Sequence, residues 1–197
     1  MRYSPEHKTK TRSRIIDQAG LLFRRKGYGG VGIDEIMGAA KLTRGGFYGY
    51  FKSKAELFTE IVRDEAGLDR MMRRRKGSSP KELHAQAAET LTDYLDPKNA
   101  TVISKQCTLA ALPSDVARAG VKDAKEAYTH KIMELAREFD RTRTGKCPTT
   151  DEQPSPEALA AVVLSVGSFS IARAMNDDTL SSTMLDAARD KALELLR

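Results

Sequence analysis

The sequence predicts an all-α fold with an N-terminal three-helix bundle that contains a helix-turn-helix and a C-terminal helical bundle. Apolar residues recur every three or four residues over much of the 197-residue chain, which is the period of an amphipathic helix. We find no segment with the character of a strand. The turn-forming run Gly77-Ser78-Ser79-Pro80 separates a domain at residues 1–56, with its connecting helix 54–76, from a domain at residues 80–197.

The first helix is predicted from Arg12 to Lys26. Its last turn is basic and Gly27 follows as a stop. The core-facing positions are those at helical spacing, namely Ile15, Ile16, Ala19, Leu22 and Phe23. These features predict an amphipathic helix with a defined end.

The second helix follows a Gly29-Gly30 turn, and its apolar positions are Ile33, Ile36, Met37 and Ala40. Asp34 and Glu35 lie in its first turn, where the helix dipole favours acidic residues. Lys41 and Leu42 then lead within a tight turn to Thr43, whose hydroxyl can cap the next helix. Two helices joined in this way are typical of the helix-turn-helix.

The third helix, Arg44 to Phe51, is rich in glycine, and each interior glycine costs about 1 kcal/mol relative to alanine. A glycine-rich loop is therefore the alternative. Phe47 and Phe51 favour the helix because residues four apart share one face. Small residues let the backbone approach a groove or a phosphate, and hydroxyls and charges stand beside them at Tyr48, Tyr50, Lys52 and Lys54.

The capping box Ser53-Lys54-Ala55-Glu56 opens the connecting helix 54–76. The second domain is predicted to hold helices at 81–95, 102–112 and 116–139, and then a long polar loop at 142–154. Ser155-Pro156-Glu157 opens another helix, with proline in its first turn. Ser181 or Ser182 opens the last one.

The positive charge of the chain is concentrated in the N-terminal part. Residues 1–56 carry 12 Lys and Arg against 5 Asp and Glu, a net of +7, whereas residues 57–197 carry 21 against 22, a net of −1. A polyanion would attract such a surface, and its binding would depend strongly on salt. The residues before the first helix, including His7, Lys8, Lys10 and Arg12, are either a flexible arm on the nucleic-acid backbone or a disordered terminus.

Several protein classes are disfavoured. The most apolar stretch, Ala158 to Met175, is interrupted by three serines and Arg173, so it predicts a buried helix rather than a membrane span. The polar Met1 to Lys10 is not a signal peptide, and the two cysteines provide neither a disulfide framework nor a metal spacing. We expect a cytoplasmic protein without cofactor or metal. No nucleophile–base pair or phosphate loop is evident, so we expect no enzyme.

The segment from Ile15 to Leu57 resembles the DNA-binding domain of the TetR/AcrR family of bacterial transcriptional regulators. The matching positions are Phe23, Gly27, Tyr28, Ile33, Glu35, Ile36, Ala40, Leu42, Thr43, Gly45, Phe47, Tyr48, Phe51, Lys54 and Leu57. The chain departs from the family at Gly32, where a Ser or Thr cap is usual, at Lys41, where glycine is usual, and at Tyr50, where His is frequent.

The resemblance implies a sequence-specific regulator of transcription, a repressor that leaves a pseudopalindromic operator when it binds a ligand. It places Thr43, Arg44, Gly45 and Gly46 against base edges, and Tyr48, Tyr50 and Lys54 on phosphates. Gly32 and Lys52 are added to these seven. The expected DNA-binding set is Gly32, Thr43, Arg44, Gly45, Gly46, Tyr48, Tyr50, Lys52 and Lys54. A nonspecific DNA-binding protein and a helical ligand carrier are the minor alternatives.

The last two helices carry broad apolar surfaces, including Leu159, Val163 and Leu180. They are either ordinary core or, as the resemblance implies, a four-helix interface of a homodimer. Two recognition helices about one turn of DNA apart also require a dimer.

The resemblance also implies a small-molecule effector bound among the C-terminal helices. Candidate contacts are Leu91, Tyr94, Cys107, Leu109, Leu112, Tyr128, Met133 and Phe169. An alternative of the same fold is an oxidant or electrophile sensor based on Cys107, with Lys105 lowering the thiol pKa and Cys147 as a disulfide partner. A buried, inert Cys107 is the other interpretation.

Overall fold

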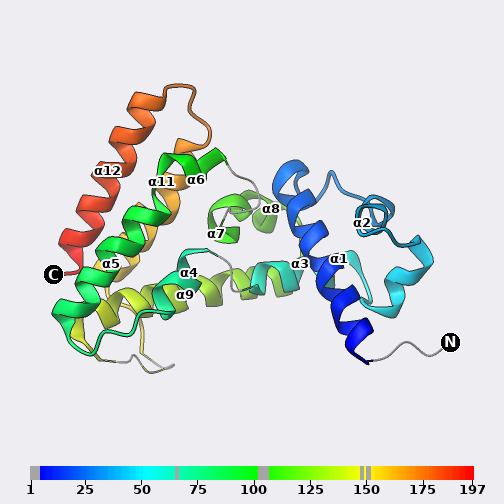
Figure 1. Ribbon diagram of the computed structural model, residues 1–197, viewed down its shortest axis with the longest axis horizontal. Helices are drawn as coiled ribbons and strands as arrows, with labels where there is room; N and C mark the ends of the chain where they lie inside the picture. The colour runs from blue at the N-terminus through cyan, green and yellow to red at the C-terminus, as the bar shows by residue number, and fades with distance from the viewer. Residues whose placement is uncertain (1–4, 65–66, 102–106, 147–148, 150–151) are drawn as a thin grey trace. The chain divides into compact units, whose positions relative to one another are not determined.

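The computed structural model describes residues 5–64, 67–101, 107–146, 149 and 152–197. Every regular element in these ranges is helical, which confirms the predicted all-α fold (Figure 1). The chain divides into two compact units, residues 1–64 with 112–128, and residues 65–111 with 129–197. The first unit thus includes 57–64 and 112–128 in addition to the 1–56 of the predicted domain. No helix in the described ranges is both long and apolar enough to span a membrane.

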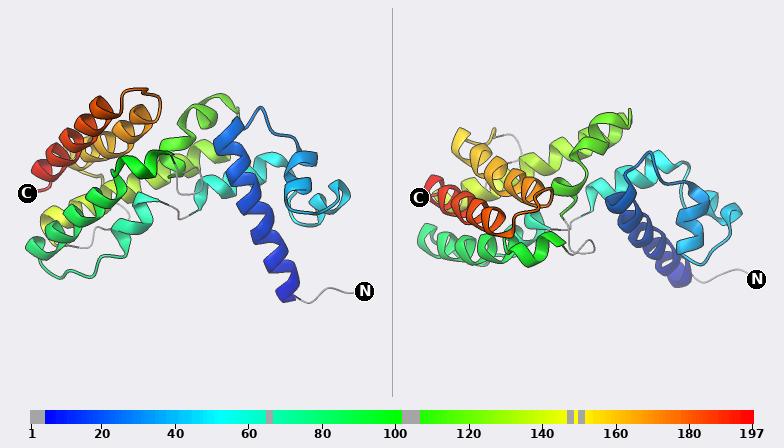
Figure 2. Two further views of the ribbon diagram at one scale, coloured as in Figure 1. Left: turned by 45° about the horizontal axis from the view of Figure 1, so that its top comes forward. Right: turned by 90° about the horizontal axis from the view of Figure 1, so that it is seen from above.

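The first unit is built from α1 (Pro5–Lys26), α2 (Ile33–Ala39), the 3₁₀ helix η1 (Arg44–Gly49), α3 (Lys54–Arg63) and α8 (Pro113–Arg118). α1 packs against α2 and α3, and η1 packs against α2 (Figure 2). Its fully buried side chains include Ile15, Ala19, Phe23, Ile36, Met37, Phe47, Leu57 and Phe58. These are largely the positions whose helical spacing predicted the bundle.

The prediction that the residues before Arg12 form an arm or a disordered terminus is wrong for the described ones, because α1 begins at Pro5. Glu6 and Lys10 form an i,i+4 ion pair of 2.9 Å on this first part of the helix. Arg12 pairs with Glu60 of α3 and lies over the Phe51 ring, with its guanidinium carbon 4.7 Å from the ring centroid. These polar contacts stabilise the N-terminal turns of α1, which precede its apolar positions.

The second unit contains α4 (Leu68–Arg73), α5 (Pro80–Tyr94), α6 (Pro97–Thr101), α7 (Thr108–Ala111) and the C-terminal part of α9 (Lys122–Thr144). It ends with α10 (Pro156–Val162), the π-helical turn η3 (Val163–Gly167), α11 (Ser168–Ala172) and α12 (Asp178–Leu195). α12 packs along α10, η3, α11 and α5 (Figures 1 and 2).

Two long predicted helices are broken at glycines with left-handed backbone. The predicted helix 54–76 is two helices, α3 and α4, and Gly67 caps the second with φ of 97°. The predicted helix 116–139 is also divided, because α8 ends at Arg118 and Gly120 has φ of 67°. Apolar spacing does not reveal such breaks, since it continues on both sides of the glycine.

Other helix boundaries differ by a few residues from the predicted ones. α12 begins at Asp178, where the Asp177 carboxylate accepts the Leu180 N–H at 2.9 Å, so neither Ser181 nor Ser182 opens it. α9 continues to Thr144, into the predicted 142–154 loop. Ser155 caps α10 as predicted. Of the predicted helix 102–112, residues 102–106 lie outside the described ranges and α7 occupies 108–111.

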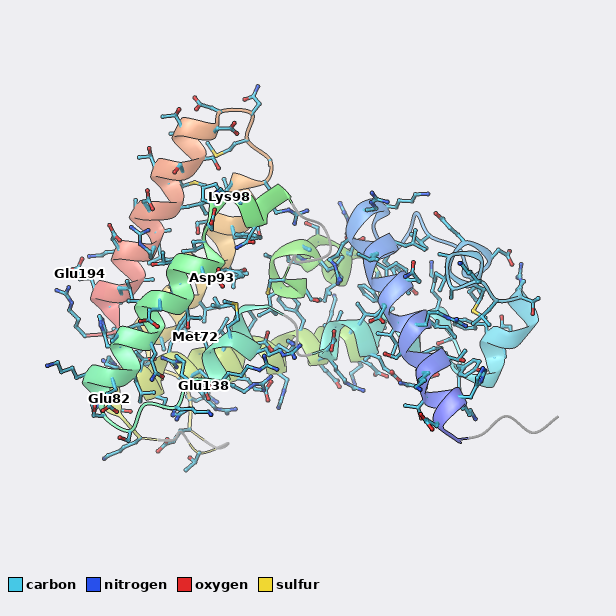
Figure 3. All side chains as sticks on the ribbon, in the orientation of Figure 1. Met72, Glu82, Asp93, Lys98, Glu138 and Glu194 are labelled. Carbon is cyan, nitrogen blue, oxygen red and sulfur yellow. The ribbon has the colours of Figure 1, made fainter. Side chains whose placement is uncertain are left out.

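Arg75 lies in the basic run before the predicted linker, yet it is only 7% exposed. Its Nε donates to the Met72 carbonyl at 2.8 Å, Nη1 to the Leu83 carbonyl at 3.0 Å and to Thr142 Oγ1 at 2.6 Å, and Nη2 to the Glu138 carbonyl at 2.9 Å. Figure 3 labels Met72 on α4 and Glu138 on α9. Burial lowers the pKa of the guanidinium below its ordinary value, and the nearby Glu138 carboxylate offsets part of this effect. Arg75 therefore joins α4, α5 and α9.

Candidate nucleic-acid interface

One side of η1 packs into the core of the first unit, and its other side is exposed to solvent. Phe47 and Phe51 are buried, with ring centroids 5.7 Å apart, and the Phe51 N–H donates to the Phe47 carbonyl at 3.1 Å. Thr43, Arg44, Gly45 and Gly46 are exposed. The predicted third helix is thus a short 3₁₀ helix with the predicted inward and outward sides. Its glycines explain why it does not become a regular α-helix.

The predicted cap by the Thr43 hydroxyl is wrong. Thr43 occupies the N-cap position with extended backbone, but its side chain accepts no hydrogen bond from the helix. The Gly46 N–H donates instead to the Thr43 carbonyl at 3.0 Å. Gly32 likewise begins α2 without a side-chain cap. The exposed Thr43 hydroxyl therefore remains available to a partner outside the chain.

Packing within the chain does not require glycine at position 45. A Cβ built there would meet no other atom within 4 Å, and a Cβ at Gly49 would meet none either. Neither residue has the positive φ that would favour glycine. The side of η1 at Gly45 can therefore approach an external surface closely.

Arg44 and the two tyrosines extend this exposed surface. The Arg44 guanidinium lies 2.6 Å from the Asp34 carboxylate, and both side chains are largely exposed. An exposed pair of this kind contributes less than about 1 kcal/mol, so a partner can displace it readily. Tyr48 is exposed and Tyr50 is half-buried. Lys52 is exposed at the end of η1.

Lys54 makes contacts within the chain. Its ammonium donates to the Tyr28 carbonyl at 2.9 Å and to the Val31 carbonyl at 3.0 Å, and it lies 4.2 Å from the centroid of the Tyr28 ring. Burial lowers its pKa from the ordinary value. In this structure Lys54 holds the loop between α1 and α2 rather than presenting a free charge.

The same loop is also held by Asp115 of α8. Asp115 Oδ1 accepts the main-chain N–H of Tyr28 at 2.7 Å. A Cβ at Gly27, which has φ of 73°, would lie 2.8 Å from that oxygen. Sequence analysis missed this contact because its two partners are 87 positions apart and neither belongs to a local motif.

Replacing Asp115 by alanine should loosen the loop. A hydrogen bond to a charged group contributes roughly 1.5–3 kcal/mol, so the Tyr28 amide should exchange with solvent at least about tenfold faster. Asp115→Asn retains an acceptor oxygen and should lie closer to the wild type. Amide hydrogen exchange of the free protein measures both. Unchanged exchange in Asp115→Ala would show that the carboxylate does not hold the loop.

The comparison with known proteins matches the N-terminal part of the chain to a family of regulators. Residues 15–61 match the model of bacterial regulatory proteins of the tetR family, a segment that contains α2, η1 and the buried residues that support them. Residues 15–61 therefore match the DNA-binding segment of the tetR family. The resemblance predicted from the segment between Ile15 and Leu57 is thereby confirmed.

Two relatives that match part of this chain are described as transcriptional regulators. The uncharacterized HTH-type transcriptional regulator YfiR of Bacillus subtilis is 33% identical over 91 residues, which cover 46% of this chain and 42% of that protein. The HTH-type transcriptional regulator AcrR of Shigella flexneri is 40% identical over 60 residues, which cover 30% of this chain and 28% of that protein. The chain thus matches less than half the length of these two relatives.

A solved structure matches over more of the chain. The TetR-family transcriptional regulator SCO4454 of Streptomyces coelicolor aligns with a TM-score of 0.68 and 17% identity, covering 94% of this chain and 95% of that one. The second unit of this chain therefore shares the fold of that protein.

The predicted effector contacts lie largely in the interior of the described residues. Six of the eight are buried, and Tyr128 and Met133 are half-buried. Leu112 and Tyr128 belong to the first unit and the others to the second. Tyr94 stacks on Phe169 with centroids 4.9 Å apart, as core aromatic residues do. None of the eight lines the surface hollows at Gly27–Gly30, at Lys52–Arg63 or at Arg137–Ser155.

Cys107 is fully buried against Gly67, where a Cβ would lie 2.6 Å from its sulfur. This burial matches the inert-cysteine interpretation, because an oxidant-sensing thiol needs access to solvent. Lys105 and Cys147, which the sensing hypothesis also used, lie outside the described residues.

The α10–α11 and α12 helices leave large apolar side chains exposed. Val163 is 69% exposed and Ile171 57%, and Leu159 and Leu180 are also exposed. Eight residues of ordinary α-helix would turn Ile171 about 80° away from Val163. The wider turn η3 accommodates an additional residue and offsets most of this rotation. Leu159, Val163 and Ile171 therefore share one side of the helix.

Proposed function

We propose that the chain is a sequence-specific DNA-binding regulator of transcription. The observation that carries the proposal is the geometry of η1, an exposed segment anchored by two buried phenylalanines and open at Gly45. A short helix of this kind in a basic unit suits the major groove, where base edges can be read. The match of residues 15–61 to the tetR family of regulatory proteins supports the same function.

The roles of the site residues follow from their exposure. Thr43 and Arg44 face base edges, and Gly45 and Gly46 admit the groove close to the backbone. Tyr48, Tyr50 and Lys52 contact phosphates. Gly32 lets the start of α2 lie near the DNA backbone. Lys54 supports this set through the α1–α2 loop, because its ammonium is held by two carbonyls of the chain.

The regulator acts as a homodimer on a pseudopalindromic operator. Exposed Val163 and Ile171 lie on one side of a helix that packs along α12, and burial of this apolar face against a second copy would remove it from water. By analogy with its family, it is a repressor released by a small effector bound in the second unit.

Selection from a random pool of DNA duplexes tests this function. The expected product is a two-fold related pair of half-sites whose centres lie about one helical turn apart. A pool that shows no enriched motif after repeated rounds would reject sequence-specific binding. Enrichment of a single, asymmetric site would reject the dimeric arrangement and leave DNA reading intact.

Replacing Arg44 by alanine should relax base choice at one position of each half-site. An arginine that reads a guanine discriminates by about 1–3 kcal/mol, so preference at that position should fall roughly tenfold or more. The matched control is Arg25→Ala on α1, which should keep the selected motif. The same motif from wild type and Arg44→Ala would remove Arg44 from the base-reading residues.

A further inference from the structure

Lys41 occupies a backbone position that favours glycine. It follows α2 with φ of 57°, in the left-handed region. Its N–H donates to the Gly38 carbonyl at 2.9 Å, and the Leu42 N–H donates to the Met37 carbonyl at 2.8 Å. This pair of bonds is the Schellman motif, in which the residue at Lys41 is usually glycine because a side chain there is sterically unfavourable.

The fold does not explain the lysine. Its side chain is exposed, and it makes no ion pair or hydrogen bond with the described residues. A strained residue that packing does not require points to a role outside the chain.

The charges around η1 indicate that role. Among the described residues 33–56 there are four cationic side chains. Arg44 is paired with Asp34, and Lys54 is bound to the Tyr28 and Val31 carbonyls. Lys41 and Lys52 are the two whose side chains have no partner within these described residues, and they stand on opposite sides of η1 in the sequence.

We propose that Lys41 binds a DNA phosphate next to the base-reading segment, paired in function with Lys52 at the other end of η1. The proposal rests on the proposed function, since its ligand is the same duplex. A lysine suits this place because its ammonium binds phosphate as a flexible point charge. The left-handed backbone is retained because this charge strengthens DNA binding at the expense of folding stability.

The proposal predicts opposite effects of Lys41→Gly on folding and on binding. Glycine relieves the backbone, so the melting temperature should rise by about 2–4 °C. Loss of one phosphate contact should lower the slope of log K against log salt by about 0.9 and weaken binding about tenfold at 0.1 M salt. The weakening should be similar on selected and scrambled duplexes, because phosphate contacts carry no sequence information.

Two further variants separate charge from backbone. Lys41→Gln keeps the side chain and removes the charge, so it should weaken binding as Lys41→Gly does. Lys41→Arg keeps the charge and should bind like the wild type. The matched control Lys81→Gln removes an exposed lysine from α5 and should leave the salt slope unchanged.

Wild-type affinity and salt slope in both Lys41→Gly and Lys41→Gln would overturn the proposal. A fall in melting temperature in Lys41→Gly would overturn the explanation by backbone strain and assign Lys41 to the end of α2, where a cation favours the helix dipole. If the wild type preferred no sequence, the proposed function would fail separately. The salt slopes on scrambled duplex would still decide the role of Lys41.

Discussion

Arg75→Met should lower the free energy of unfolding by about 3–5 kcal/mol, the largest effect we expect from one substitution. The guanidinium donates to three main-chain carbonyls and one threonine hydroxyl from α4, α5 and α9. Methionine fills similar space and supplies no donor, so these acceptors would lose the guanidinium's hydrogen bonds and the Glu138 carboxylate would lose its cation. Chemical denaturation measures the loss.

The adjacent Arg74 provides the control for Arg75. Arg74 is exposed and has no ion pair with a described residue, so Arg74→Met should change stability by less than about 0.5 kcal/mol. Arg75→Lys should fall between the two, because one ammonium cannot reach acceptors on three helices. If Arg75→Met unfolded at the same denaturant concentration as Arg74→Met, the guanidinium would not hold the second unit together.

Val163→Lys should convert the proposed homodimer to a monomer and weaken binding to the proposed operator by about a hundredfold or more. Val163 is 69% exposed beside Leu159 and Ile171, at the face we assign to the second copy. A lysine there would place a charge in the interface, at a cost in desolvation. Two linked DNA-binding units gain roughly 10²–10⁴ in affinity over one, which the monomer would lose.

Sedimentation and DNA titration of the same Val163→Lys sample test this prediction. Ala85→Lys adds the same charge at an exposed position of α5 and should remain dimeric. The melting temperature of each separately expressed variant reports whether the protein folds. A Val163→Lys protein that sediments as a dimer with wild-type affinity would exclude this face as the interface.

Periodicity and caps predicted most of the fold because they are local properties. Helical spacing around Phe23, Met37 and Phe47 located the three-helix bundle, and Ser53 and Ser155 marked helix starts correctly. The breaks at Gly67 and Gly120 were missed, since a single glycine is compatible with both a helix interior and a left-handed turn.

The candidate site was predicted by position but not by contact. Exposure of Arg44 and Tyr48 agrees with the predicted outward side of the third helix. The roles of Lys54, Asp115 and Arg75 depend on main-chain groups distant in sequence, which no spacing rule identifies. The basic run 73–76 contains the exposed Arg74 and the buried Arg75, and its sequence does not distinguish them.

An affinity comparison tests sequence-specific DNA binding most directly. The purified protein is titrated by fluorescence anisotropy with its selected duplex, or with duplex from immediately upstream of its own coding region, and with a scrambled duplex of the same composition at the same salt. We predict binding at least about a thousandfold tighter to the specific duplex, with a steep decrease as salt rises. Equal affinities for the selected and scrambled duplexes would contradict the account, because the basic unit would then bind DNA without reading it.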